Sequence, residues 1–213
     1  MNLYGASGHC KVVIDAIKKS ENLKIDAIFD DNPVVESILG ISIIKPNNDN
    51  LQSINDVIVT IGDNLSRKKV VGKLQTNFLK IVHKNAIVSD FAAIGDGSVV
   101  FAGAIINASA VVGQHCIINS GAVVEHDCQI SDFVHISPNA SLAGNVSIAE
   151  GAHIGIGAIV LQGVAVGKWA TIGAGAVVLK NIPDYAVAVG NPARIIKTKD
   201  NFSLLSLLHS HIV

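Results

Sequence analysis

A repeat of six residues fills the second half of the chain and restricts what that half can fold into. From Ala86 to Asn181 the sequence divides into sixteen hexads without a gap, from AIVSDF and AAIGDG to ATIGAG and AVVLKN. The third position is Val, Ile or Leu in every hexad, and the first is Ala, Ser, Cys or Val. A hexapeptide period sustained over this length is typical of a parallel β-helix.

Alternation of side chains within each hexad predicts how the interior is filled. Positions one and three lie on the same, inward face of a short strand, so small and aliphatic residues form the core. The composition agrees, because hydrophobic residues make up 49% of the chain and aromatic residues only 4%. Three hexads form one triangular coil, so residues three hexads apart stack on successive coils, about 4.8 Å apart. The sixteen hexads therefore predict a little more than five coils, of a handedness that the period does not define.

The first eighty residues alternate predicted strands and helices. The stretch NLYGASGHCKVVIDAI predicts a short strand, a glycine turn and a helix. LKIDAIFDD and DVIVTIGDN predict two more strands, and RKKVVGKLQ predicts an amphipathic helix. This order indicates a small parallel α/β sheet, whose ligands bind beyond the carboxyl ends of the strands. The residues that fall at this edge are Ser7, Gly8, His9, Asp30, Asp31 and Gly62.

Two kinds of ligand group fit this predicted edge. Backbone amides at the start of the first helix can bind a phosphate, and Asp30 and Asp31 suit hydroxyl groups or the N–H edge of a base. The turn Gly5-Ala6-Ser7-Gly8 lacks the third glycine of a GxGxxG dinucleotide motif. The Asp-Asp-Asn-Pro stretch is equally compatible with a plain turn.

Charge and cysteine content exclude several classes of partner and compartment. The formal net charge is −1, which gives no electrostatic reason to expect a nucleic acid or an acidic membrane. The three cysteines form no CxxC pair, and an odd number without an export signal favours reduced thiols in the cytoplasm. No apolar run reaches the roughly 18 residues that span a bilayer. We therefore expect a soluble, cytoplasmic protein.

One hexad ends with three ionisable residues in a row. The stretch GAVVEHDCQI places Glu125, His126 and Asp127 together among small and aliphatic residues. A histidine of near-neutral pKa beside a carboxylate is what general-base catalysis requires. The pattern alone is compatible with an active site or with a solvated corner of the fold.

With both halves interpreted, the chain resembles the bacterial sugar acetyltransferases that join a small Rossmann-like domain to a left-handed β-helix. That group includes N-acetyltransferases of nucleotide-linked 4-amino-4,6-dideoxy sugars in the bacillosamine pathway and sialic acid O-acetyltransferase-like proteins. The resemblance covers about residues 1–197 and is carried by YGASGHCKVV, FDD, IGDNLSR, INSGAVVEHDCQISDFVHISPNASLAG and GNPARIIK. Cys10 departs from the Gly or Ala expected after the histidine. The implied organisation is a Rossmann-like nucleotide-sugar-binding domain at 1–80, a left-handed β-helix acetyltransferase domain at 81–198 and a tail at 199–213.

The resemblance also implies an activity and a site. The activity is acetyl-CoA-dependent acetylation of the 4-amino group of a nucleotide-linked amino-deoxy sugar, by direct attack on the thioester. His126 is the implied general base, with Asp127 raising its basicity or holding its orientation. The implied acetyl-CoA contacts are His135, Gly144, Gly155, Gly173 and Arg194, and the implied substrate contacts are Ser7, Gly8, His9, Asp30, Asp31 and Asn119. Gly144 is also indicated by the repeat, because it lies three hexads after His126 and so one coil away.

The expected assembly is a homotrimer with active sites between neighbouring subunits, without a bound metal, a nucleic acid or a membrane partner. Three alternatives remain open at this stage. One is O-acetylation of a sugar hydroxyl, as on a sialic acid. Another is a zinc enzyme of the hexapeptide-repeat class, for which His135 and His153 should stack but His115 and His126 should not converge with them within one subunit. The third is a catalytically silent scaffold or sugar sensor.

Overall fold

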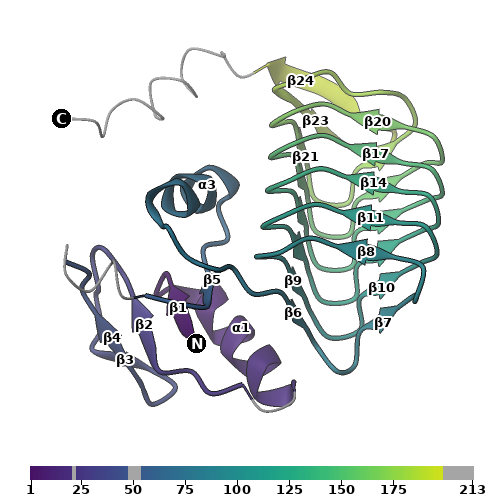
Figure 1. Cartoon of the computed structure of the whole chain (residues 1–213). Helices are drawn as coiled ribbons and strands as arrows, with labels where there is room; N and C mark the ends of the chain where they lie inside the picture. Colours follow the sequence, from purple (N-terminus) through teal and green to yellow (C-terminus); the bar gives the residue numbers. More distant parts are fainter. Residues whose placement is uncertain (21–22, 48–53, 199–213) are drawn as a thin grey trace.

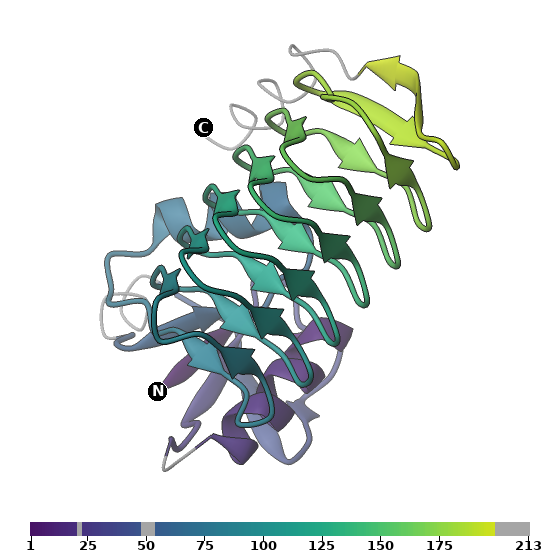
Figure 2. The same cartoon turned by 90° about the vertical axis from the view of Figure 1, so that its right-hand side faces the viewer.

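The computed structural model describes residues 1–20, 23–47 and 54–198, and the predicted tail at 199–213 lies outside the described residues. The chain forms a small α/β unit followed by a tall stack of coils (Figure 1). The two parts lie side by side, with the α/β unit against the first coils of the stack (Figures 1 and 2).

The α/β unit has the predicted strand–helix alternation with one addition. Its sheet has the strand order β3-β4-β2-β1-β5, in which β1, β2, β4 and β5 run parallel and β3 pairs antiparallel with β4. The strands are β1 Asn2–Tyr4, β2 Ala27–Phe29, β3 Ser37–Ile38, β4 Ile41–Ile44 and β5 Val57–Val59, and the helices are α1 Gly8–Lys19 and α3 Asn64–Lys73. The β3–β4 hairpin was not predicted, because its short strands show no clear alternation. Helix α3 begins three residues before the predicted stretch.

The coils form a left-handed β-helix with three parallel sheets. The sheet that faces the α/β unit, called the docked sheet, contains β6 Ile81–Val82, β9 Val99–Val100, β12 Ile117–Ile118, β15 His135–Ile136, β18 His153–Ile154 and β21 Thr171–Ile172, and is extended by β23 Ala186–Val189 and β24 Arg194–Thr198. The sheet called the aliphatic sheet contains β7 Ile87–Val88, β10 Ile105–Ile106, β13 Val123–Val124, β16 Ser141–Leu142, β19 Ile159–Val160 and β22 Val177–Val178. The third sheet contains β8 Ala93–Ile94, β11 Val111–Val112, β14 Gln129–Ile130, β17 Ser147–Ile148 and β20 Ala165–Val166.

The register confirms the predicted stacking. Strand β13 pairs with β10 and β16 so that Val123 lies between Ile105 and Ser141, each three hexads away along the chain. First-position residues such as Ala122 and Cys128 are 0% exposed, and so is the third-position Val124. The second position of each hexad points outward, and the inward residues form one continuous core.

The α/β unit covers the outward face of the docked sheet. The second-position residues Val99 and Ile117, and Ile81 in register with them, are at most 2% exposed, although a lone β-helix would leave them in water. They share a hydrophobic cluster with Val13 and Ile17 of α1. The contact between the two parts is therefore an apolar core of its own, which fixes α1 against the coils.

Two further observations concern the cysteine thiols and the length of the helices. The three cysteines are buried free thiols. Within the described ranges, no helix combines the length and the apolar character that a membrane crossing requires.

Candidate active site

His126 and Asp127 form a hydrogen-bonded pair at an exposed corner. They lie in the turn between β13 of the aliphatic sheet and β14 of the third sheet, with side chains 62% and 59% exposed. The Nδ1 of His126 lies 2.8 Å from the Oδ2 of Asp127. Because a carboxylate only accepts hydrogen bonds, Nδ1 carries the proton and Nε2 presents its lone pair. The hydrogen bond to Asp127 is the main cause that raises the pKa of His126; desolvation opposes it, and the charges of Asp127 and Glu125 add to the rise.

The backbone of this corner directs Asp127 toward the imidazole ring. Asp127 has φ 62°, in the left-handed region that the sixth position of several hexads adopts. Aspartate tolerates this conformation better than most residues. The corner geometry of the coil therefore orients the carboxylate that holds the ring.

Gly144 lies directly beneath the imidazole ring of His126, one coil away as predicted. A Cβ added to Gly144 would lie 2.6 Å from both Cε1 and Nε2 of His126. The backbone N–H of the next residue, Asn145, donates to the carbonyl of His126 at 2.9 Å. Glycine at position 144 therefore gives the ring the room it occupies.

A second group of predicted residues meets on the docked sheet. His135 and His153 stack with ring centroids 4.8 Å apart, and the His9 ring of α1 lies 6.3 Å from that of His135. Asn119 donates from Nδ2 to Nε2 of His135 at 3.0 Å. Burial, and then the charges of nearby His153, Arg67 and His9, lower the pKa of His135 to about 3, so this ring is neutral.

Ser137 belongs to the same group and was not predicted. Its hydroxyl lies 2.8 Å from Nε2 of His153. Ser137 occupies the fourth hexad position, as do Asn119 on the preceding coil and Gly155 on the following one. This shared position along the coils is the signal by which the sequence could have identified it.

The predicted substrate contacts Asp30 and Asp31 both accept hydrogen bonds from groups within the α/β unit. Asp30 accepts hydrogen bonds from the N–H groups of Ala6 and Asn32, at 2.7 and 2.8 Å. Asp31 accepts from the hydroxyl of Tyr4 at 2.6 Å, and this bond adds to burial in raising the pKa of the tyrosine. Asp30 thus shapes the loop before α1, and Asp31 orients Tyr4. Ser7 and Gly8 are exposed at the start of α1, where the Ser7 side chain makes no capping hydrogen bond.

The remaining predicted residues lie further along the stack. Gly155 and Gly173 follow β18 and β21 of the docked sheet. A Cβ on Gly155 would lie 2.6 Å from the carbonyl oxygen of Ile172, and one on Gly173 would lie 2.7 Å from Val189. Both glycines are therefore required by the close approach of successive coils. Arg194 lies in exposed β24, beside a hollow of about 480 Å³ at the end of the stack.

The structure brings these residues into two separate groups. His126, Asp127 and Gly144 lie at the corner between the aliphatic and third sheets, opposite the docked sheet of the triangular coil. His135 lies in β15 of the docked sheet, Asn119 follows β12 of the same sheet, and the His9 ring of α1 lies near His135. Ser7 and Gly8 directly precede His9 at the start of α1. The predicted base and the predicted substrate loop therefore do not share a site within one chain.

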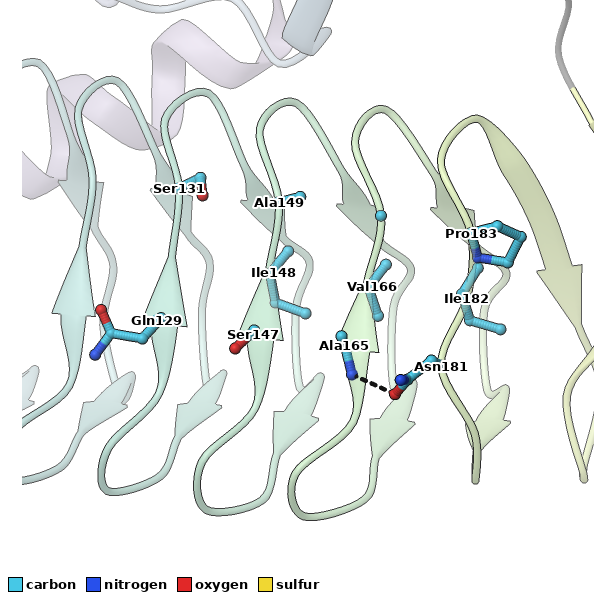
Figure 3. A pocket seen from close by; sticks show the side chains of 11 residues that line it. Gln129, Ser131, Ser147, Ile148, Ala149, Ala165, Val166, Asn181, Ile182 and Pro183 are labelled. Carbon is cyan, nitrogen blue, oxygen red and sulfur yellow. Dashed lines mark hydrogen bonds between the residues drawn. The ribbon is translucent and has the colours of Figure 1, made fainter.

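A hollow on the third sheet lies apart from both groups. It has a volume of about 440 Å³ and is lined by strands β14, β17 and β20 and the segment from Asn181 to Pro183 (Figure 3). Its outward side chains include the small Ser147 and Ala165 and the longer Gln129, and Asn181 accepts a hydrogen bond from the Ala165 N–H at 2.9 Å. None of the predicted site residues lines it.

The histidines do not assemble a metal site in the part of the chain that is described. His135 and His153 stack as the zinc alternative required, but among the described residues no group of three or more His, Cys, Asp or Glu side chains is placed to hold a metal ion. His115 lies buried at another corner, stacked on Phe133 with centroids 5.1 Å apart.

Comparisons with known proteins identify the class of protein to which the chain is similar. Residues 1–74 match the PglD N-terminal domain. PerB from Caulobacter crescentus, solved with CoA and GDP-perosamine, is 36% identical, with 92% of this chain and 96% of that chain covered and a TM-score of 0.86. The acetyltransferase domain of PglB from Neisseria gonorrhoeae, solved with acetyl coenzyme A, is 37% identical, with 92% and 98% covered and a TM-score of 0.83. WeeI from Acinetobacter baumannii is 29% identical over the same shares, with a TM-score of 0.81. A search of curated proteins gave no match.

The fold and the likeness of the chain to these structures define an acyltransferase of the hexapeptide-repeat class. Because PerB is 36% and PglB 37% identical to it over nearly the whole of each chain, the chain belongs to the PglD-like family of bacterial sugar acetyltransferases.

Proposed function

We propose that the protein transfers an acetyl group from acetyl-CoA to the 4-amino group of a nucleotide-linked amino-deoxy sugar, with His126 as the general base. The observation that carries the proposal is the exposed Nε2 of His126. Its lone pair is available because Nδ1–H is held by Asp127. Relatives solved with CoA and GDP-perosamine, or with acetyl coenzyme A, support the donor and the acceptor class.

In the proposed acetyl transfer, each group at this corner has one role. The amine attacks the thioester carbonyl directly, and Nε2 of His126 takes the proton that the nitrogen loses. Asp127 stabilises the imidazolium that results, since the raised pKa of His126 reflects this interaction. The N–H of Gly144 is our proposed donor to the developing oxyanion, where one preorganised donor contributes about 10²–10³ in rate. Collapse of the intermediate releases the CoA thiolate and the amide.

The α/β unit is our proposed site for the nucleotide. The first amides of α1 lie beside exposed Ser7 and Gly8, where a helix N-terminus favours a phosphate. His9 and Asp31 flank this loop, and Asp30 maintains its shape through the Ala6 N–H. On the docked sheet, His135, Gly155 and Gly173 are the proposed contacts of acetyl-CoA, with Arg194 beyond them. Asn119, which donates to His135, is a proposed contact of the sugar substrate.

A homotrimer unites the two groups of residues in this proposal. The aliphatic sheet exposes Ile87 and Ile159 by 65% and 46%, so it presents an apolar face beside the corner that carries His126. Association of copies through this face in a closed ring would place His126 of one subunit next to the docked sheet of its neighbour. We propose that each active site is completed in this way, in a cytoplasmic enzyme whose thiols remain reduced.

The decisive experiment is a thiol-release assay with acetyl-CoA across a panel of nucleotide-linked sugars. The panel pairs each 4-amino sugar with its 4-hydroxy counterpart. Release that requires the amine, with the acetamide identified by mass spectrometry, is the expected result. Release only with hydroxyl acceptors would replace the proposal with O-acetylation, and absence of release with all of them would contradict it.

A further inference from the structure

A buried arginine lies at the junction between the α/β unit and the coils. Arg67 of α3 is 1% exposed, and its hydrogen bonds all go to uncharged oxygens. Its Nε donates to the His115 carbonyl at 2.8 Å, and its Nη2 donates to the Phe133 carbonyl at 2.9 Å. The other contacts are from Nη1 to the carbonyls of Ile61 and Gly62, at 3.0 and 3.2 Å, and from Nη2 to Oδ1 of Asn64 at 2.8 Å. All the donors of the guanidinium are thus used.

Asn64 continues this set of contacts to the next coil. Its Nδ2 donates to the carbonyls of Gly151 and Ala152, both at 3.1 Å. His115, Phe133 and Gly151 are spaced three hexads apart, so their carbonyls stand at the same corner on three successive coils. The two side chains therefore bind the β-helix at the spacing of its coils.

Lys68, the next residue of α3, contacts a further coil at this corner. Its ammonium lies 5.7 Å from the ring centroid of Phe133 and 5.5 Å from that of Trp169, and it pairs with Glu150. Helix α3 thus lies along the corner between the third and docked sheets (Figure 1). The corner and α3 are joined by polar contacts, unlike the apolar contact under α1.

These contacts also fix the loop that follows β5. The carbonyls of Ile61 and Gly62 bind the same guanidinium that binds the coils. A Cβ on Gly62 would lie 4.0 Å from the Cβ and Cγ of His9, whose ring lies near His135. Arg67 therefore links the loop after β5 to the corner between the third and docked sheets through one rigid planar group.

Joining two surfaces through a desolvated cation that is bound only to neutral oxygens costs free energy of desolvation. Burial lowers the pKa of Arg67 to about 10, which reports that cost. An apolar side chain of similar volume would avoid it, but it could not fix the directions of several carbonyls. The geometry thus favours a role in alignment over a role in stability alone.

We propose that Arg67 and Asn64 are positioning residues that set the nucleotide-sugar loops in register with the coil that carries the acetyl donor. The inference rests on the proposed function, because it assigns the two ends of the reaction to the two parts that these residues join. Misplacement of reactants by about 1 Å can lower a rate by about 10²-fold without weakening binding.

The test compares Asn64→Ala and Arg67→Met with Val70→Ala. Val70 lies on the same helix, is 7% exposed and packs against the sheet of the α/β unit, so its variant destabilises α3 without touching the carbonyls. We expect kcat to fall about 10–100-fold in the first two variants, with KM for each substrate changed by less than about threefold. Val70→Ala should lower Tm and leave kcat near the wild-type value.

Hydrogen exchange gives a readout that does not depend on activity. Amides of residues 60–63 should exchange faster in Asn64→Ala and Arg67→Met than in Val70→Ala. An unchanged kcat in folded Asn64→Ala, or a raised KM with kcat intact, would overturn the inference, and so would equal exchange in all three variants. Asn64→Ala decides the matter if Arg67→Met does not fold. A wild-type protein inactive on the whole sugar panel would instead contradict the proposed function, and exchange would still test the alignment.

Discussion

At the scale of single residues, His126 differs from the buried histidines in its surroundings. Burial lowers the pKa of His9 and of His115 to about 4, and that of His135 to about 3. These three rings stay neutral at physiological pH and pack against other rings. His126 is exposed and its pKa is raised by Asp127. Among these four, it alone has the pKa direction of a base that can gain a proton near neutral pH.

Replacement of this base should affect catalysis and not folding. We expect His126→Ala to lower kcat by about 10²–10⁴, the usual contribution of general-base catalysis. Its Tm should stay close to that of the wild type, because the side chain is 62% exposed and contributes no core packing. Steady-state kinetics and a thermal melt check this together. Near-normal activity in the folded variant at pH 7 would exclude His126 from the mechanism.

The carboxylate beside the base should set the pH dependence. His126 must be neutral to accept a proton, so kcat/KM falls as pH drops through its pKa. Since Asp127 raises that pKa, Asp127→Asn should move the acidic limb of the profile to lower pH and reduce the maximum rate. Glu125→Gln is the matched control, because the charge of Glu125 is the smallest cause of the shift and should move the limb less. A limb that stays in place in Asp127→Asn would contradict this assignment.

At the scale of elements, the coil corners combine structural and catalytic requirements. The sixth hexad position takes a left-handed backbone at Asp127 and at Phe133, with φ 62° and 60°. At the corner between the aliphatic and third sheets, this conformation orients Asp127, the partner of His126. At the corner between the third and docked sheets, it presents the ring and the carbonyl of Phe133 to α3. A regular repeat can therefore carry different chemistry at each corner without changing its inward positions.

The glycine beneath the base gives a test at this scale. Gly144→Ala would place a Cβ 2.6 Å from His126 Nε2, so the ring must move and activity should fall at least tenfold, by our estimate of about 1.4 kcal/mol of lost transition-state stabilisation. In a His126→Ala background the same change meets no ring and should cost little. A double-mutant cycle on kcat measures this coupling. Additive effects would mean that Gly144 acts independently of His126, as an oxyanion donor alone would.

At the scale of the whole molecule, the group around His126 and the group around His135 lie apart. The proposed homotrimer must therefore bring them together. Helix α1 covers the first strands of the docked sheet, and the corner that carries His126 lies on the opposite side of the coil. The exposed aliphatic sheet is the surface through which copies of the chain could meet. The proposed active site then depends on quaternary structure as much as on the fold.

Mixed oligomers test this dependence directly. His126→Ala and His135→Ala subunits should each be nearly inactive alone. If each site combines His126 of one subunit with His135 of its neighbour, random mixing in equal amounts leaves about a quarter of the sites intact. Refolded mixtures should therefore regain about a quarter of wild-type activity, and light scattering should report a trimer. No recovery in a mixed trimer, or full wild-type activity in a stable monomer, would contradict this arrangement.

The sequence by itself determined the β-helix and the local chemistry of its corner. A hexad with small first and aliphatic third residues leaves one way to bury them, so the stacking of every third hexad and the position of Gly144 beside His126 were both predictable. The pairing of Asp127 with its neighbour was implied by the resemblance to the family and not by the period. The stacking and the position of Gly144 depend on contacts within one coil or between adjacent coils, which the period specifies.

Only the tertiary structure decided how the two halves meet. Helix α3 buries Asn64, Arg67 and Val70, a stripe in which two of three residues are polar, so hydrophobic periodicity could not identify its buried face. Arg67 binds backbone carbonyls on distant coils, those of His115 and Phe133, which no side-chain pattern encodes. The tertiary structure likewise assigned Asp30 to a loop contact and separated His126 from the docked sheet. Such features arise from long-range packing, where the type of a residue does not indicate which residue it contacts.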